Sequence, residues 1–224
     1  TWDEEPLRQS DRLETYADAL SVLQEQGIIY PCFCTRRAIA DEVSRMTNAP
    51  HGPEGPVYPG TCRSISADER TAKISTGEPH SWRLDSAKAA ESCGDLTFQD
   101  LLLGTIAVNL DTMGDVVLAR RDIATSYHLA VVTDDAGQKV TLISRGEDLL
   151  SSTHIHRILQ DLLGYPEPLY LHHELVCDAA GERLATRNDA LSIASLRSSG
   201  YTPAEVLERL PPMPSLLGNL PGGT

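Results

Sequence analysis

The sequence lacks any apolar run long enough to cross a membrane, and its cysteines do not suit a disulfide framework. Apolar runs such as Leu101–Leu103 and Ile28–Ile29 are far shorter than the roughly 20 residues that a membrane helix requires. The five cysteines are odd in number and three of them cluster, which favours a metal site in a cytosolic protein. We therefore expect a cytoplasmic protein with no membrane partner.

Positive charge is also scarce. The chain has 19 Lys and Arg against 32 Asp and Glu, a formal net charge of −13. This charge argues against a broad electrostatic platform for nucleic acid, whose phosphates favour a basic surface. The local clusters Arg36–Arg37 and Arg120–Arg121 can contact RNA or remain solvated surface charges, and the sequence leaves both interpretations open.

Apolar residues nevertheless make up 41% of the 224 residues, enough to bury the core of one domain or of one domain with a small insertion. From Leu13 to Leu23 they recur at a helical period that stops at Gly27, which predicts an opening helix. Thr35 can cap a second helix, from Arg36 to about Met46. The segment Ser81–Leu84 has the pattern of a short strand.

The most informative segment runs from Tyr127 to Asp135, and we predict that it forms a buried strand with polar groups at its ends. Arg145 follows ten residues later. Ligands of α/β sheets bind beyond the carboxyl ends of the strands, so we expect Tyr127 and Arg145 to converge on one small molecule. A guanidinium suits a carboxylate; the alternative is a structural salt bridge from Arg145 to Glu147 or Asp148.

A parallel strand-helix-strand unit follows. Apolar residues from Ile155 to Leu163 have helical spacing and end at Gly164, and Tyr170–Val176 is predicted as the next strand. Neighbouring residues of a strand point to opposite faces, so we do not expect His172 and His173 to bind one metal ion. A structural role, or one at the edge of an ATP site, is favoured for this pair.

Three clustered cysteines predict a metal site. Cys32 and Cys34 precede a Pro- and Gly-rich stretch, and Cys62 follows it. Three thiolates and a fourth ligand make a closed tetrahedral zinc site of the structural kind. The residues alone leave the fourth ligand open between Tyr58 and His51.

The segments Ser126–Asp135 and Val140–Gly164 resemble the second half of the catalytic domain of class I glutamyl- and glutaminyl-tRNA synthetases. The short segment after Ile193 leaves no room for an anticodon-binding domain, which points to the glutamyl-Q tRNA(Asp) synthetase branch. The resemblance implies an enzyme that activates glutamate with ATP, with Mg²⁺ expected, and transfers glutamate to the queuosine base at the wobble position of tRNA(Asp). It also implies Tyr127 and Arg145 as the glutamate-binding residues.

The resemblance further implies an α/β fold, a Rossmann-like parallel sheet of the class I aminoacyl-tRNA synthetases with an inserted zinc-containing subdomain. Val116–Leu118 would return the chain to the main sheet. Because the family has a Cys-x-Cys and a Tyr-x-x-x-Cys motif, it implies Cys32, Cys34, Tyr58 and Cys62 as the Zn²⁺ ligands. The implied division is 1–30, the end of the first half of the nucleotide-binding fold; 31–115, the insertion; 116–200, the second half; and 201–224, a short helix and tail.

A mobile ATP-phosphate loop of the KMSKS type is implied after the last predicted strand. Thr186 stands where the family usually has its second lysine. The sequence contains no His-x-Gly-His motif, so we expect that ATP-binding signature upstream of Thr1. Two alternatives are a fragment of an ordinary glutamyl-tRNA synthetase and a non-catalytic module that binds glutamate or RNA. The residues of the KMSKS-like loop are Arg183, Leu184, Ala185, Thr186 and Arg187.

Overall fold

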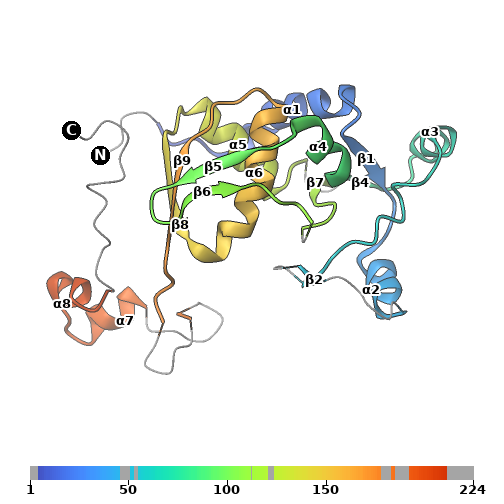
Figure 1. Ribbon diagram of the computed structural model, residues 1–224. Helices are drawn as coiled ribbons and strands as arrows, with labels where there is room; N and C mark the ends of the chain where they lie inside the picture. The colour runs from blue at the N-terminus through green and yellow to red at the C-terminus, as the bar shows by residue number, and fades with distance from the viewer. Residues whose placement is uncertain are drawn as a thin grey trace.

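The computed structural model describes residues 5–45, 51–52, 55–111, 113–120, 124–177, 183–184 and 192–210. Within them the strands form a four-stranded mixed sheet, a three-stranded antiparallel sheet and a short hairpin. In Figure 1 the helices α1, α4, α5 and α6 lie with the two larger sheets in one body, while α2 and α3 stand at one side and α7 and α8 at the opposite end. No helix of the described residues is long and apolar enough to cross a membrane.

The four-stranded sheet has the order β6-β5-β9-β8. Its β8 and β9 run parallel, β9 also pairs in parallel with β5, and β5 and β6 form an antiparallel hairpin. The sheet is therefore mixed rather than wholly parallel, because the short β5–β6 connection reverses the chain. The strand bounds are β5 Thr97–Asp100, β6 Gly104–Ala107, β8 Leu142–Gly146 and β9 Leu169–His173.

The three-stranded sheet has the order β1-β4-β7, with both pairs antiparallel. Its strands are β1 Ile29–Cys32, β4 Ser81–Leu84 and β7 Val117–Arg120. The prediction that Val116–Leu118 rejoins the main sheet is wrong, because β7 pairs with β4 in this separate sheet. The hairpin consists of β2 His51–Gly52 and β3 Gly55–Pro56.

The predicted opening helix is confirmed as α1, Leu13–Glu25, which buries Tyr16, Ala19, Leu20 and Leu23. The second predicted helix is α2, Arg36–Arg45, and the Thr35 hydroxyl accepts a hydrogen bond from the Ala38 amide at 3.1 Å. The remaining helices are η1 Gln9–Asp11, α3 Ala67–Ser75, α4 Ser86–Cys93, α5 Tyr127–Gly137, η2 Glu147–Leu149, α6 Leu150–Leu162, α7 Ile193–Ser198 and α8 Pro203–Leu207.

The prediction of a buried strand from Tyr127 to Asp135 is wrong, because the segment forms helix α5. A short apolar run is compatible with a buried strand and with a buried helix, and its periodicity cannot distinguish the two. Helix α5 packs against α1, α6 and β7. Residues on several sides of it are therefore buried, and the usual polar stripe of a surface helix is lost.

The predicted parallel unit is confirmed, although its second strand ends at His173 and does not extend to Val176 as predicted. Strand β8 leads through η2 and α6 to β9, with Arg145 opposite His172 in the register. Helix α6 ends at Leu162, and Gly164 follows with φ 66°, a left-handed conformation that glycine adopts without strain. The main core contains α1, α5 and α6 side chains such as Leu23, Leu129 and Leu159. The four-part domain division stays a prediction.

Asp134 attaches the N-terminal part of the described chain to helix α5. This buried residue of α5 accepts hydrogen bonds from Gln9 Nε2 at 3.0 Å, Arg12 Nε at 2.7 Å and the Tyr16 hydroxyl at 2.8 Å. The contact attaches α1 to α5 through a charge-assisted network, the stronger kind of hydrogen bond.

Replacing Asp134→Ala should lower the free energy of unfolding by about 3 kcal/mol, because Arg12 and Tyr16 would lose their shared acceptor. Urea unfolding measures the change. Asp18→Ala removes an exposed carboxylate of α1 and should stay within about 0.5 kcal/mol of the unsubstituted protein. Equal destabilisation by the two substitutions would contradict a specific role for Asp134.

Candidate functional site

Arg145 of β8 and Tyr127 at the start of α5 lie close together, as the sequence predicted. Arg145 Nη1 is 3.4 Å from the Tyr127 hydroxyl. Tyr127 is 49% exposed and Arg145 is half-buried, so both can face a ligand. The two residues come from a strand and a helix, rather than from two neighbouring strands.

Arg145 is held by uncharged acceptors that the sequence analysis did not single out for this role. Its Nε lies 3.2 Å from His172 Nε2, and its Nη1 lies 3.1 Å from His156 Nδ1. Its Nη2 donates to the Thr153 hydroxyl. Thr153 and His156 belong to α6 and are buried, and they lie three positions apart, so the helix presents both on one face. This spacing was the one available sign in the sequence.

The alternative role for Arg145, a salt bridge to Glu147 or Asp148, does not occur among the ion pairs of the described residues. Asp148 instead pairs with Arg183 at 2.9 Å. Because Arg145 has no ion pair among the described residues, its guanidinium can still bind an anionic ligand directly.

Behind His172 lies Asp100, at the end of β5. Both side chains are fully buried, and His172 Nδ1 is 2.7 Å from Asp100 Oδ2. Burial opposes the ionisation of Asp100, but hydrogen bonds from His172 and from the backbone amides of Leu102 and Leu103 outweigh it, so the pKa of Asp100 is lowered. The pair therefore contains an ionised carboxylate.

Burial sets the charge state of the imidazoles. It lowers the pKa of His172, although the hydrogen bond to Asp100 acts in the opposite direction. The pKa of His156 is well below its ordinary value because of burial, and then because of the nearby Arg145 and His128. His156 Nε2 is 3.1 Å from His128 Nδ1. Both His156 and His172 are therefore neutral near pH 7.

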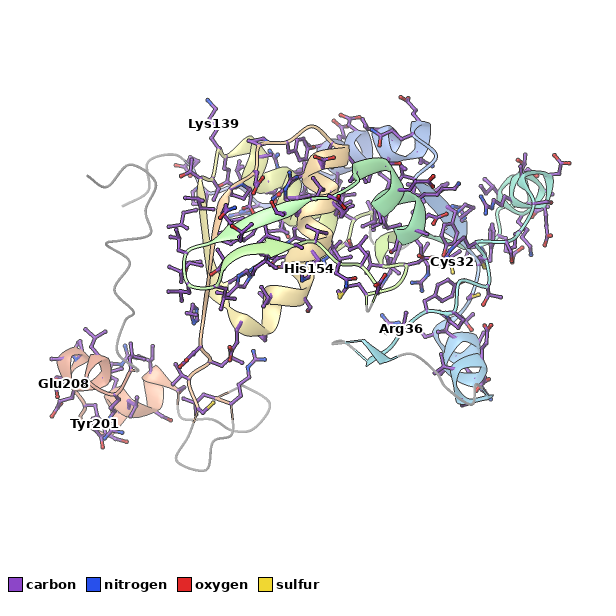
Figure 2. All side chains as sticks on the ribbon, in the orientation of Figure 1. Cys32, Arg36, Lys139, His154, Tyr201 and Glu208 are labelled. Carbon is purple, nitrogen blue, oxygen red and sulfur yellow. The ribbon has the colours of Figure 1, made fainter. Side chains whose placement is uncertain are left out.

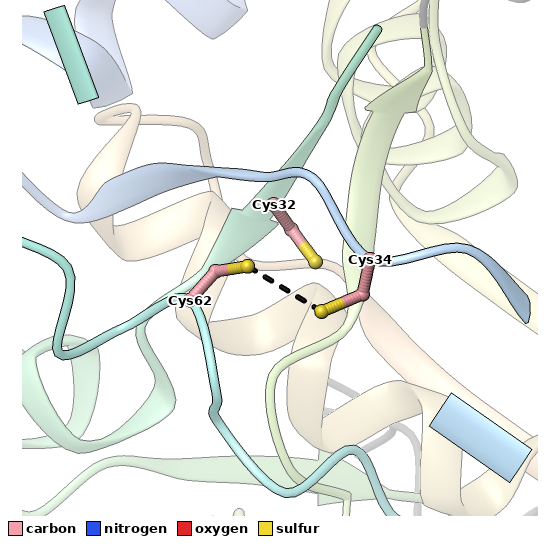
Figure 3. Close-up of side chains that lie close together, drawn as sticks. All are labelled: Cys32, Cys34 and Cys62. Atoms are coloured by element: carbon pink, nitrogen blue, oxygen red, sulfur yellow. Dashed lines mark hydrogen bonds between the residues drawn. The ribbon is translucent and has the colours of Figure 1, made fainter. Parts of the chain in front are cut away.

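A second candidate site is the cysteine cluster, where Figure 3 shows the sulfur atoms of Cys32, Cys34 and Cys62 turned toward one another. These atoms lie within 4.8 Å of one another. The Tyr58 oxygen lies 3.4 Å from Cys32 Sγ and 3.6 Å from Cys34 Sγ. The predicted sulfur and oxygen donors thus converge and could hold a metal ion. The side chain of His51 lies outside the described residues.

The cysteine cluster is tied to the three-stranded sheet. The guanidinium of Arg83 lies 3.9 Å from the centre of the Tyr58 ring, a cation–π contact, and its Nη1 donates to the Asp115 carbonyl at 2.6 Å. The buried Asp115 carboxylate accepts from Arg63 Nη2 at 2.6 Å and from the Tyr30 hydroxyl. Figure 2 shows Cys32 apart from His154 of α6, the helix that also carries Thr153 and His156, so the two candidate sites occupy different parts of the molecule.

The KMSKS-like segment is described only in part. Arg183 forms an isolated antiparallel bridge with Cys177, and its side chain pairs with Asp148. Leu184 is exposed. Ala185, Thr186 and Arg187 lie outside the described residues, so the predicted role of this segment stays a prediction.

Three comparisons with known proteins agree with one another. Residues 1–213 match the family described as tRNA synthetases class I (E and Q), catalytic domain. The chain is 45% identical over 212 residues to the glutamyl-Q tRNA(Asp) synthetase of Rhodobacter capsulatus, which covers 92% of this chain and 75% of the relative. It is 41% identical to the enzyme of the same name from Nocardia farcinica, over 93% of this chain and 63% of the relative.

The fold is similar to the crystal structure of glutamate-tRNA synthetase from Elizabethkingia anophelis. The TM-score is 0.67 at 23% identity, and the match covers 88% of this chain and 38% of that chain. At 23% identity, this structural similarity supports only an inference about the fold. It bears out the α/β class with a mixed sheet.

Because His156 is neutral when folded and gains a proton on unfolding in acid, stability should fall as the pH drops below about 6.5. When the folded state lowers the pKa of a histidine, the resulting stability is fully present above the pKa of the unfolded state. It is lost progressively as the pH falls from that value toward the pKa of the folded state. His156→Gln should reduce the slope of stability against pH between about pH 5 and 6.5, by up to about 1.4 kcal/mol per pH unit.

Urea unfolding across this pH range measures the slope. The groups that face His156 are Arg145, His128, His172 and Tyr127, and none of them is altered by the substitution. His173→Gln changes an exposed imidazole and serves as the control, for which we expect the slope of the unsubstituted protein. An unaltered slope in His156→Gln would refute the neutral buried state.

Proposed function

The chain belongs to the class I tRNA synthetase (E and Q) catalytic-domain family, and on this premise we propose that it acts in ATP-dependent activation of glutamate and its transfer to the queuosine base at the wobble position of tRNA(Asp). The carrying observation is the convergence of Arg145 and Tyr127. The two relatives described above, at 45% and 41% identity, are named glutamyl-Q tRNA(Asp) synthetase. The chain spans 75% and 63% of their lengths.

The arrangement of Arg145 supports glutamate as the substrate. Its contacts to His172, His156 and Thr153 hold one side of the guanidinium. Among the described residues, two N–H groups of Arg145 remain for a ligand. One is on Nη2, and the other is the Nη1 proton directed at the Tyr127 hydroxyl over a long 3.4 Å contact. A glutamate carboxylate can accept both, while the neutral amide of glutamine would leave the half-buried cation without a directly bound carboxylate.

ATP would lie near the segment from Arg183 to Arg187, with Mg²⁺ as its counter-ion. Cations of this segment stabilise the negative charge that develops on the phosphates as the adenylate forms. Arg183 pairs with Asp148, which follows β8 closely in sequence. A cation from this segment is therefore held near the strand that carries Arg145.

We also infer that Zn²⁺ is bound by Cys32, Cys34, Tyr58 and Cys62. Thiolates are preferred ligands of Zn²⁺, and a four-ligand site without an open position is structural. The ion would join the end of β1 to the segment that follows β3, because Cys62 comes after that hairpin. Its role is to hold this part of the fold, with no step of the reaction assigned to it.

The proposed function is tested with the longest protein encoded by the reading frame that contains these residues. We expect glutamate-dependent exchange of pyrophosphate into ATP, and transfer of labelled glutamate to tRNA(Asp) that carries queuosine. The matched control is tRNA(Asp) with guanosine at the wobble position, which should accept no label. Labelling of tRNA(Glu) would instead indicate an ordinary glutamyl-tRNA synthetase, and glutamate binding without exchange a non-catalytic module.

Arg145→Lys should lower kcat/KM for glutamate by about 100-fold or more in the exchange assay, because an ammonium cannot reproduce the planar fork. Tyr127→Phe removes one hydroxyl and should cost about tenfold or less. Arg157 pairs with Asp161 and Glu167 rather than with residues that contact Arg145, so Arg157→Lys is the control for loss of a guanidinium. A normal KM for glutamate in Arg145→Lys would remove Arg145 from the pocket.

Zinc binding is tested by metal analysis of purified protein and by chelator competition. Cys34→Ser and Tyr58→Phe should each lower zinc affinity by about tenfold or more, since each removes a proposed ligand. His51→Ala tests the rival ligand and should retain about one zinc per chain. Loss of zinc in His51→Ala with retention in Tyr58→Phe would assign the fourth position to histidine.

A further inference from the structure

Three side chains on three adjacent strands form a continuous line of hydrogen bonds. Asp100 ends β5, His172 is on β9 and Arg145 is on β8, and these strands are neighbours in the sheet (Figure 1). Asp100 Oδ2 lies 2.7 Å from His172 Nδ1, and His172 Nε2 lies 3.2 Å from Arg145 Nε. The line runs from a buried carboxylate to the guanidinium beside Tyr127.

The two ends of this line dictate the tautomer of the histidine between them. An ionised carboxylate can only accept, so the proton on the near side of the ring is on Nδ1. A guanidinium can only donate, so Nε2 must carry a lone pair. Both conditions are met by one neutral tautomer of His172. Histidine is therefore an acceptor for Arg145 and a donor to Asp100 at the same time.

Asp100 is itself fixed in place. Its Oδ1 accepts from the amides of Leu102 and Leu103, each at 2.9 Å, and its Oδ2 also accepts from the amide of His172 at 3.0 Å. The carboxylate is thus attached to the turn after β5 and to β9. Because backbone amides fix the position of the Asp100 carboxylate, its hydrogen bond to Nδ1 restricts rotation of the His172 ring.

Thr153 completes the inner side of the site. Its hydroxyl lies 2.9 Å from His172 Nε2, and it accepts from Arg145 Nη2. Nε and Nη2 of arginine lie on the same edge of the guanidinium plane, so His172 and Thr153 together hold that edge. The opposite part of the guanidinium then faces Tyr127.

We propose that Asp100 and His172 are positioning residues that orient Arg145 for the carboxylate of the substrate. This inference rests on the proposed function and extends it to two residues that do not themselves touch glutamate. Without the His172 acceptor, the Nε–H of Arg145 loses its partner, and the guanidinium gains freedom to rotate about the side-chain bonds. Binding of glutamate then weakens, while binding of ATP does not depend on this contact.

Two substitutions of His172 separate positioning from a merely structural role. The carbonyl of a glutamine reaches the position of Nε2, so His172→Gln can still accept from Arg145. The amide of an asparagine reaches only the position of Nδ1, so His172→Asn can still donate to Asp100 but offers nothing to Arg145. The two variants remove the same ring. His172→Gln keeps the acceptor for Arg145 and loses the donor to Asp100, while His172→Asn keeps the donor and loses the acceptor. His173→Asn, at the exposed neighbouring position, is the control for a histidine change on β9.

Pyrophosphate exchange is measured in the longest natural reading frame, with KM for glutamate and for ATP determined separately and thermal midpoints recorded. We expect His172→Asn to raise KM for glutamate about tenfold or more. His172→Gln should raise it by only about threefold, because it keeps the acceptor for Arg145 but loses the orienting contact with Asp100. KM for ATP should be unchanged in both, and His173→Asn should behave as the unsubstituted protein.

If the unsubstituted protein is active and His172→Asn and His172→Gln have equal KM for glutamate, this inference alone is overturned. A rise in both KM values together with a lower thermal midpoint also overturns it, since that pattern indicates a structural role. An unsubstituted protein without glutamate-dependent exchange overturns the proposed function, and the positioning role with it.

Discussion

The guanidinium of Arg145 must be held half-buried without being neutralised, and much of the surrounding structure meets this constraint. Its hydrogen-bond partners among the described residues are two imidazoles and two hydroxyls. Hydrogen bonds to neutral acceptors fix the orientation of the cation while leaving its charge for a ligand. The parallel β8-α6-β9 unit supplies three of the four acceptors, because α6 crosses back over the sheet before β9 begins.

Two buried carboxylates hold other parts of the fold together. Asp134 binds Arg12 and Tyr16 and so secures α1 against α5, and α5 carries Tyr127 at its first position. Asp115 binds Arg63 and Tyr30 and so secures the cysteine cluster against the three-stranded sheet. Buried carboxylates that keep several donors are stable only when every donor stays in place. The positions of Tyr127 and of the cysteine cluster therefore depend on these two contacts.

Features with local or strongly periodic signals could be predicted from the sequence. The helix from Leu13, the Thr35 cap, the parallel unit and the gathering of the three cysteines each follow from spacing that local structure must satisfy. The helix at Tyr127 could not be predicted, since its short apolar run suits either element and only its neighbours α1, α6 and β7 decide between them. Asp100 could not be found either, because only the pairing of β5 with β9 brings it to His172.

A physical reason explains why a histidine, rather than a carboxylate, contacts Arg145 directly. A carboxylate in direct contact with Arg145 would orient it equally well, but the resulting ion pair would neutralise the cation and compete with the carboxylate of a substrate. The neutral imidazole of His172 passes on the orientation and keeps the negative charge one ring farther away. Burial favours this neutral state by lowering the pKa of His172, and protonation would replace the acceptor with a second donor facing Arg145. The same burial that stabilises the core thus keeps the guanidinium free to bind an anion.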